Sequence, residues 1–216
     1  MNVSLAALAP KDRYKLMIGL VIPRPIALVS SRGTAGIDNC APFSFFNVLC
    51  EDPPLLIVSV ETRRDGTPKD TARNIRETGV FCVNLVDESI ADPMYVCSLD
   101  YPPDEPEAPA AGLTLAPCVD IPCPRILEAP ASFECRLFKT VDIGTQRLIA
   151  IGEALRLHTR AGIADPATHR VEASAYHPVG RLYGNLYAHQ RDRFTLPTGT
   201  AEAETLHPKG RKPAAE

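Results

Sequence analysis

The chain has 216 residues, of which 45% are hydrophobic and 23% are charged, proportions that are ordinary for a globular protein with a buried core. A net charge of −3 argues against nucleic-acid binding, because nucleic acids usually bind to a basic protein surface. No apolar run approaches the roughly 20 residues of a membrane span. The first residues lack the charged start and apolar stretch of a signal peptide. We therefore expect a cytoplasmic protein without a membrane partner.

The seven cysteines predict neither a disulfide framework nor a metal site. Any pairing scheme leaves one of the seven over, and no two of them form a C-x-x-C pair. The five histidines show no zinc-ligand spacing against them. We expect reduced thiols in the core and in loops, and no bound metal.

The first third of the chain predicts one short helix followed by strands. Residues 10–19 are typical of a helix, with Pro10 in its first turn and Gly19 at its stop. Residues 25–33 (PIALVSSRG) predict a strand that ends in a glycine-containing turn. Residues 39–47 mix polar and aromatic side chains without a clear period, which favours a bent strand or a loop.

The best-marked helix follows the apolar strand at residues 55–61. Thr67 is a suitable N-cap with Pro68 at the first helical position; alternatively, Asp70 caps a slightly later start. Gly79 marks the helix end. Residues 80–88 then predict another strand, and residues 88–98 a helical segment.

The second half predicts a proline-rich surface excursion between strands. Residues 100–130 contain PPDEPEAPAAG, and strands resume directly after them. Residues 132–144 and 146–160 alternate well enough to form antiparallel strands joined near Gly144. Residues 197–216 are small, polar and charged, so we expect a disordered tail after a single domain at residues 1–196. Six or more strands, few helices and no alternation of strands with helices favour one antiparallel barrel.

Two stretches combine side chains that suit a ligand. The helix start TPKDTARNI offers free backbone N–H groups, the positive charge of Lys69, and the neutral donors Thr71 and Asn74, a set that suits a phosphate. Alternatively, Thr67 and Asp70 simply cap a surface helix.

The aromatic turn places hydrogen-bonding groups beside rings, as a flat heteroaromatic ligand requires. Its candidate residues are Asn39, Ser44, Phe45, Asn47 and Cys50. Alternatively, the phenylalanines form a packed barrel corner. Asp87 with Glu88 is a weaker candidate that also suits a helix start, and His177 is a lone histidine before a proline. No dinucleotide fingerprint, P-loop or G-x-S-x-G is present.

In this order, the segments PRPIALVSS, GIDNCAPFSFFNVLCEDPPLLIVSV, KDTARNI and FCVNL resemble the flavin reductase-like proteins of the FMN-binding split-barrel superfamily. RLIAIGEALRLH and HPVGRLYGNLYA resemble the distal strands and C-terminal signature of that family. The resemblance implies a mainly β fold, an antiparallel and Greek-key-like split barrel with short helical insertions. It also implies a homodimer that binds FMN non-covalently.

The resemblance also implies roles for individual residues. Asn39, Phe45 and Cys50 match positions beside the isoalloxazine ring, and Lys69 and Thr71 match positions near the phosphate. The rest of the matching set is Ser30, Ser44, Asp70 and Asn74.

One departure concerns the nicotinamide. Many members that reduce free flavin carry Gly-Asp-His before the strand that matches LIAIGEALRLH, whereas this chain has Gly144-Thr145-Gln146-Arg147. We nevertheless predict an oxidoreductase that reduces bound FMN with NAD(P)H and passes electrons to a second flavin, to a small acceptor or to a partner monooxygenase. We expect the nicotinamide at a barrel mouth lined by Phe45, Cys50 and either Tyr183 or His177, and Asn47 and His177 are the first substitutions to test. The alternative is a non-catalytic FMN carrier.

Overall fold

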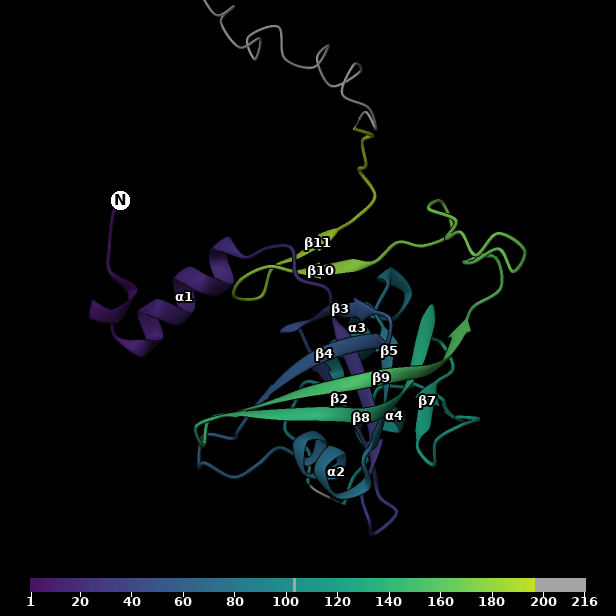
Figure 1. The fold of residues 1–216 in the computed structure, drawn as a ribbon, viewed down its shortest axis with the longest axis horizontal. Helices are drawn as coiled ribbons and strands as arrows, with labels where there is room; N and C mark the ends of the chain where they lie inside the picture. The colour runs from purple at the N-terminus through teal and green to yellow at the C-terminus, as the bar shows by residue number, and fades with distance from the viewer. Residues whose placement is uncertain (103, 197–216) are drawn as a thin grey trace, which may run out of the picture.

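The computed structural model describes residues 1–102 and 104–196. Its largest feature is a seven-stranded antiparallel sheet (Figure 1). The strands are β1 (Ala27–Arg32), β2 (Asp38–Phe43), β3 (Phe46–Glu51), β4 (Pro54–Glu61), β5 (Val80–Leu85), β8 (Ala131–Ile143) and β9 (Arg147–Thr159). Their order across the sheet is β2-β1-β5-β8-β9-β4-β3. Residues 197–216, for which we predicted a tail, lie outside the described part of the chain.

The chain connection shows that this sheet curls into a barrel. β2 and β3 stand at opposite ends of the strand order, yet β2 ends at Phe43 and β3 begins at Phe46. Three residue steps span only about 10 Å, so the two edges must approach each other. The Ser59 N–H donates to the Phe45 carbonyl at 2.8 Å and ties this link to β4. The predicted antiparallel barrel is confirmed.

The inside of the barrel holds the larger apolar core. Ala27 and Val29 of β1 point inward, and Leu28 between them points outward, as alternation along a strand requires. Gly152 of β9 lies under the ring of Phe81, where a Cβ atom would come within 2.4 Å of the ring. Close packing therefore explains this glycine. The predicted β8–β9 pairing is correct, and Gly144 turns the hairpin with φ of 55°.

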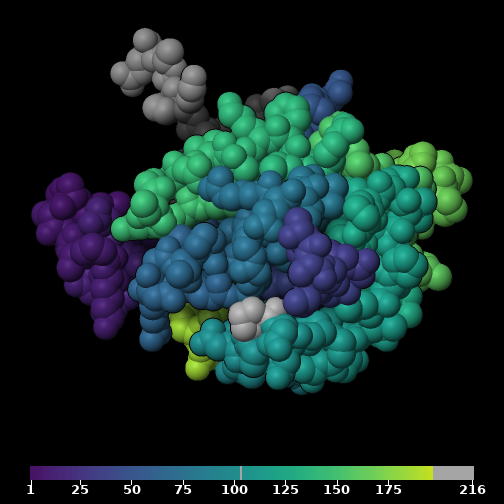
Figure 2. All heavy atoms as spheres, turned by 90° about the horizontal axis from the view of Figure 1, so that it is seen from below, coloured from purple at the N-terminus to yellow at the C-terminus, as the bar shows by residue number. Residues whose placement is uncertain are grey.

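The prediction of a surface excursion at residues 100–130 is wrong. This segment contains α4 (Glu107–Ala110), β6 (Leu115–Pro117) and β7 (Pro124–Ile126), and it packs on the outer face of the sheet. Ala108 is 1% exposed, Leu113 5% and Ile126 0%. Figure 2 shows the teal atoms of this part of the chain covering a continuous area of one side of the molecule. This segment therefore covers the outer face of the sheet with buried apolar side chains.

The helices correct two predicted boundaries. α1 (Pro10–Leu20) continues through Gly19, and none of its residues is buried. It stands apart from the barrel in Figure 1, and Figure 2 shows the same purple projection. α2 (Asp70–Thr78) begins after Lys69, whereas the Thr67 hydroxyl and N–H bind Asp65 in the preceding turn. Neither Thr67 nor Asp70 is the N-cap, but Gly79 ends the helix in the left-handed conformation as predicted, with φ of 70°.

The remaining elements are short. They are the 3-10 helices η1 (Leu5–Ala7) and η2 (Glu88–Ile90), α3 (Ala91–Val96), β10 (Val179–Arg181) and β11 (Tyr187–His189). η2 and α3 match the predicted helical segment. β10 and β11 form a two-stranded ribbon whose Arg181 exchanges backbone hydrogen bonds with Arg24 at 2.8 and 3.0 Å. Within the described residues, none of the helices is both long and apolar enough to cross a membrane.

Candidate functional site

The start of α2 borders a polar cavity of about 670 Å³. The cavity lies between β2, the loop before α2, and the segment that contains α4. Its charged and hydrogen-bonding walls include Asn39, Arg63, Arg64, Lys69, Asp70, Thr71 and Glu107. Loop, helix start and distal segment therefore enclose one space, although they are far apart in sequence.

Lys69 gives this cavity a cation beside free backbone donors. Lys69 is the N-cap residue of α2, and no side chain accepts hydrogen bonds at this cap. The first N–H groups of a helix lack partners inside the helix and carry partial positive charge. The Lys69 ammonium lies 3.6 Å from Glu61 Oε1 and 5.9 Å from the centre of the Phe43 ring. This arrangement suits an anionic group such as a phosphate.

Asp70 does not cancel that charge, because two guanidinium groups already pair with it. Arg63 and Arg73 both form ion pairs with the Asp70 carboxylate. Arg63 also donates to the Pro68 carbonyl at 2.5 Å, which holds the loop against the helix start. We conclude that Asp70 orients Arg63 at the cavity wall.

Asn39 and Thr71 join β2 to the start of α2. In the amide orientation that satisfies both side-chain atoms, Asn39 Oδ1 accepts from the Thr71 hydroxyl at 2.8 Å and Asn39 Nδ2 donates to Glu107 Oε1 at 3.2 Å. Glu107 Oε2 accepts from the Cys40 N–H at 2.7 Å. Burial, with a smaller contribution from Asp70, raises the pKa of the Glu107 carboxyl. The cavity therefore holds a carboxyl group that resists ionisation.

Asn74 lies behind this cavity. Its Nδ2 donates to the Ser31 hydroxyl at 3.1 Å, and the side chain borders a separate space of about 80 Å³. Asn74 is 2% exposed, and its Oδ1 has no hydrogen-bond partner among the described residues. Asn74 thus joins α2 to β1 behind the cavity wall and does not line the cavity itself.

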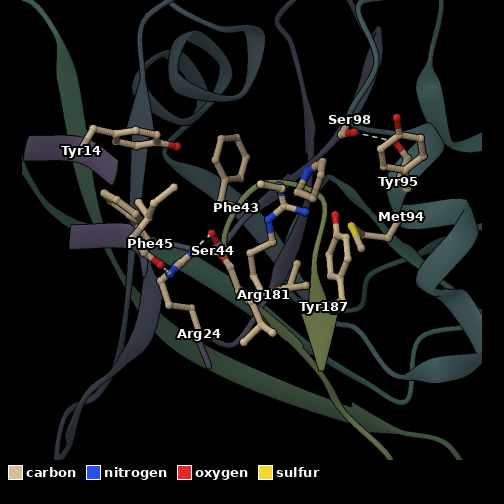
Figure 3. Close-up of a pocket in the computed structure, with 15 residues that line it drawn as sticks. Tyr14, Arg24, Phe43, Ser44, Phe45, Met94, Tyr95, Ser98, Arg181 and Tyr187 are labelled. Carbon is tan, nitrogen blue, oxygen red and sulfur yellow. Dashed lines mark hydrogen bonds between the residues drawn. The ribbon is translucent and has the colours of Figure 1, made fainter. Parts of the chain in front are cut away.

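A second cavity, of about 340 Å³, is aromatic (Figure 3). Five of its lining side chains carry rings: Tyr14, Phe43, Phe45, Tyr95 and Tyr187. They come from α1, the end of β2, the β2–β3 link, α3 and β11. The hydroxyl of Ser44 also lines this cavity. Arg147 stacks its guanidinium 4.8 Å from the centre of the Phe45 ring, so Phe45 is held from behind.

Two arginines face this aromatic cavity, whose lining includes no carboxylate. Arg24 is 8% exposed and donates to the carbonyls of Ile18, Val21 and Leu182 at 2.6–2.7 Å. Arg181 binds the Gly184 carbonyl at 2.5 Å and lies 4.4 Å from the centre of the Tyr187 ring. In Figure 3 the Arg181 guanidinium points into the cavity between Phe43 and Tyr187. The cavity is therefore both aromatic and cationic.

The two cavities adjoin, because Pro42, Phe43 and Ser98 line both of them. Their volumes lie in the range of small-molecule sites. Uncapped N–H groups and Lys69 stand at one end, and rings stand at the other. This donor set fits FMN, which combines a phosphate with a flat ring.

Three predicted site residues lie elsewhere. Ser30 points to the outer face of β1, where its hydroxyl donates to the Pro124 carbonyl at 2.6 Å. Asn47 is exposed on β3, and its Oδ1 accepts from the Val48 N–H at 2.8 Å. Cys50 Sγ donates to the Asp52 carbonyl at 3.3 Å. None of the three lines either cavity, so the structure does not bring them together with Lys69 and Phe45.

The weaker candidates have structural positions. Asp87 Oδ1 accepts from the Ser89 N–H at 3.1 Å, so Asp87 caps η2 as the alternative reading of that pair predicted. His177 accepts a hydrogen bond from the Glu88 N–H through its carbonyl at 3.1 Å. Tyr183 is 49% exposed. His177 and Tyr183 line neither cavity.

The sequence did not predict Glu107, Arg181 and Tyr14 as residues of the site. Glu107 belongs to the proline-rich segment 100–130, which its composition predicts to lie at the surface. The two others reach the aromatic cavity from opposite ends of the chain. A signal for Arg181 was present, because it belongs to the C-terminal motif VGRLYG.

The sequence model of the flavin reductase like domain matches residues 19–185. This match spans most of the chain, so the protein belongs to the flavin reductase-like family. The family resemblance drawn from the ordered segments is confirmed.

Two solved structures are similar to this chain in both sequence and fold. The 2-nitrobenzoate 2-nitroreductase of Pseudomonas fluorescens is 39% identical, with a TM-score of 0.85 over 93% of this chain and 97% of its own. Component B of the nitrilotriacetate monooxygenase from Bacillus cereus is 34% identical, with a TM-score of 0.86 over 91% of this chain and 98% of its own.

A more distant structure agrees with the fold, and one curated relative is also similar in sequence. A Shewanella frigidimarina protein with a split barrel domain has a TM-score of 0.79 at 23% identity, over 92% of this chain and 100% of its own. The fold is accordingly the split barrel of flavin reductases. A Bradyrhizobium diazoefficiens relative, the FMN reductase (NADH) RutF, is 28% identical over 83% of this chain and 91% of its own length.

Proposed function

We propose that this protein binds FMN non-covalently and is an NAD(P)H-dependent oxidoreductase that passes electrons to a second flavin or a small acceptor. The observation that carries the proposal is the pair of adjoining cavities, one polar with Lys69 and uncapped N–H groups at the start of α2, and one aromatic. The family, and the FMN reductase (NADH) among its members, support it.

The residues of the two cavities would bind different parts of FMN. Lys69 and the first N–H groups of α2 would hold the phosphate, and Asn39 with Thr71 would fix that helix start. Phe43 and Phe45 would provide apolar area for the ring, with Ser44 at its edge. When bound, FMN supplies the hydride chemistry itself, and the protein has only to hold two flat rings in register and limit the access of water.

A binding experiment tests the cofactor first. We expect a flavin spectrum in the purified protein and a large thermal shift with FMN, since a ligand at a thousand times its dissociation constant stabilises by about 4 kcal/mol. A colourless protein that FMN does not stabilise would contradict the cofactor assignment.

An anaerobic titration with NADH and NADPH, followed at the flavin band, then tests the electron donor. We expect one of them to bleach the bound flavin. A flavin band that stays oxidised over minutes with both would favour the alternative of an FMN carrier, which keeps the cofactor but has no turnover. We include a partner monooxygenase among the acceptors, because a similar structure is a component of such a system.

A second candidate is reduction of an aromatic carboxylate that bears a nitro group. Five rings and two guanidiniums without a carboxylate suit a flat anion, and a 39% identical structure is a 2-nitrobenzoate nitroreductase. Replacing Arg181 by Leu should lower kcat/KM for 2-nitrobenzoate and leave that for neutral nitrobenzene unchanged. Equal losses for both compounds would remove this candidate.

We also propose a homodimer. α1 buries none of its residues, and Met17, Leu20 and Val21 at its end are 52%, 77% and 63% exposed. Apolar area of this kind usually has a partner, and a second copy would cover it symmetrically. Light scattering at micromolar concentration should give twice the mass of the chain.

A further inference from the structure

Three thiols meet on the outer face of the barrel, away from both cavities of the candidate site. Cys82 of β5 and Cys123, which precedes β7, form a buried cluster with Ile121, and Cys118 packs against it. Cys82 is 0% exposed and Cys123 3%, whereas Cys118 is half-buried. One thiol of the three is therefore accessible, and two lie beneath it.

The register of the β6–β7 ribbon places two of these thiols directly opposite each other. Pro117 pairs with Pro124, so Cys118 and Cys123 are the next pair toward the turn. The Cys118 N–H donates to the Cys123 carbonyl at 3.3 Å, which shows that the pairing continues. Opposed residues of antiparallel strands have Cα atoms about 5.5 Å apart when hydrogen-bonded, a spacing that a disulfide can bridge.

A buried carboxylate holds the turn between these two cysteines. Glu134 is 0% exposed, and its two oxygens accept from the N–H groups of Val119 and Asp120 at 2.7 Å each. His158 Nε2 lies 2.5 Å from the same carboxylate. Asp120 is in turn bound by Arg156 at 2.8 and 3.1 Å. Side chains of β8 and β9 thus hold this turn in place. The turn in turn keeps Cys118 and Cys123 close to each other.

Cys118 and Cys123 also line a small cavity of about 300 Å³ that opens to solvent. Its other walls are mostly prolines and apolar side chains, with the guanidinium of Arg32 at one side. Asp38 binds Arg32 at 2.7 and 2.9 Å. A small uncharged molecule such as a hydroperoxide can therefore enter without displacing an ion pair.

The surroundings favour a thiolate at Cys118. Hydrogen bonds from Cys123 and then Cys82 lower the pKa of the Cys118 thiol to about 4, against the opposing effects of burial and of Glu134. The same contacts raise the pKa of Cys82 and Cys123. Cys118, the half-buried thiol of the three, is therefore the one favoured to ionise, and the thiolate is the nucleophilic form.

We propose that Cys118 and Cys123 form a reversible thiol–disulfide site that reacts with hydroperoxides. The Cys118 thiolate attacks the terminal peroxide oxygen, so an S–O bond forms, the O–O bond breaks, and the leaving alkoxide or hydroxide takes a proton. Cys123 then attacks the sulfur of the resulting sulfenic acid; an S–S bond forms, the S–O bond breaks, and the Cys123 proton leaves with the hydroxide as water. Two thiols are oxidised and one peroxide is reduced to an alcohol or water.

Peptide mapping of the full chain tests this site. The reduced protein is treated with one equivalent of hydrogen peroxide, free thiols are blocked with N-ethylmaleimide, and the digest is analysed by mass spectrometry. We expect a Cys118–Cys123 cross-link that dithiothreitol reverses. The half-buried thiol of Cys50, which lies outside this cluster, should remain free and be blocked by the maleimide. A cross-link to Cys82 instead, or oxidation of Cys50 before Cys118, would overturn the proposal.

Two serine variants keep the test informative. In Cys123→Ser the sulfenic acid cannot be resolved by its neighbour, so dimedone should label Cys118 after peroxide treatment. Cys118→Ser should remove both the label and the cross-link, and Cys50→Ser should change neither. Circular dichroism shows whether each variant is folded. If folded Cys123→Ser carries no dimedone label at Cys118, the three thiols serve only for packing.

Discussion

The Asn39 side chain and the Thr71 hydroxyl lie 2.8 Å apart and connect β2 to the first turn of α2. Asn39 is half-buried and Thr71 is 1% exposed, so water competes little for this bond. It joins the element that borders the aromatic cavity to the element that carries Lys69. This contact therefore links the two ends of the candidate site.

Replacing Thr71 by Val tests that connection. Valine keeps the shape of threonine but removes the hydroxyl that donates to Asn39 Oδ1, which then keeps only the Cys40 N–H at 3.2 Å, so we expect a loss of about 0.5–1.5 kcal/mol in the free energy of unfolding. Thr71→Ser keeps the hydroxyl and should lose clearly less. Urea unfolding of the three proteins measures the difference. Equal stabilities of the valine and serine variants would show that the bond contributes nothing.

Replacing Lys69 by Ala tests the phosphate end of the proposed FMN site. A charge-assisted hydrogen bond contributes about 1.5–3 kcal/mol, so FMN should bind at least about tenfold more weakly. Riboflavin, which lacks the phosphate, should bind nearly as before. Lys139→Ala, at an exposed position on β8, is the control. Equal losses for both flavins would place Lys69 away from the phosphate.

Two glycine substitutions, one inside the barrel and one in α1, should have opposite effects on stability. A Cβ at Gly152 would come within 2.4 Å of Phe81 Cζ and 3.1 Å of Cys135 Cβ, so Gly152→Ala should destabilise the fold by about 1–3 kcal/mol. Nothing lies within 4 Å of a Cβ at Gly19. Since Gly19 is helical, Gly19→Ala should stabilise by roughly 0.5–1 kcal/mol. Thermal unfolding of both variants should show shifts of opposite sign.

Local signals in the sequence were sufficient for much of the fold. Alternation predicted the β8–β9 hairpin, and Gly79 predicted the end of α2, because each depends on neighbouring residues only. The helix start at Lys69 also follows from local chemistry, but Thr67 was assigned to the wrong role: Asp65 competes for its hydroxyl in the turn before the helix.

The predictions that were wrong or incomplete concern features that depend on contacts between distant segments of the chain. Apolar residues spaced among prolines, such as Leu113 and Ile126, do not show which surface they cover. The pattern of β1 separates Ser30 from Val29, but it does not tell which face meets the ligand. The aromatic cavity combines α1 with β11, so Tyr14 and Arg181 become neighbours only after folding.

The C-terminal end of the described chain predicts a pH dependence of stability. Hydrogen bonds from Arg191, and also from His189, lower the pKa of Glu88 to about 2 in the folded protein. A lowered pKa stabilises the fold above the ordinary pKa of glutamate, and that stabilisation is lost as the pH falls toward 2.

Glu88→Gln should therefore be less stable than the wild type at pH 7, and the difference should disappear near pH 2. Chemical unfolding at several pH values measures it. Glu51→Gln, at an exposed position on β3, is the control and should show a much smaller difference at pH 7. A difference for Glu88→Gln that is constant with pH would mean that its carboxylate does not contribute through its charge.

Glu107→Gln should strengthen FMN binding, and more so at high pH. Burial raises the pKa of Glu107, so the carboxyl group is neutral at low pH and charged above its raised pKa. Only the charged form repels a phosphate in the same cavity. At a separation of about 10 Å this repulsion is on the order of 1 kcal/mol, so we expect about a three- to tenfold gain in affinity at pH 8 and a smaller gain at pH 5. Flavin fluorescence titrations at both pH values measure the change in affinity.

Glu107→Asp keeps the charge and should not show the gain. If Glu107→Gln binds FMN more weakly than the wild type at pH 8, the carboxylate instead accepts a hydrogen bond from the ligand.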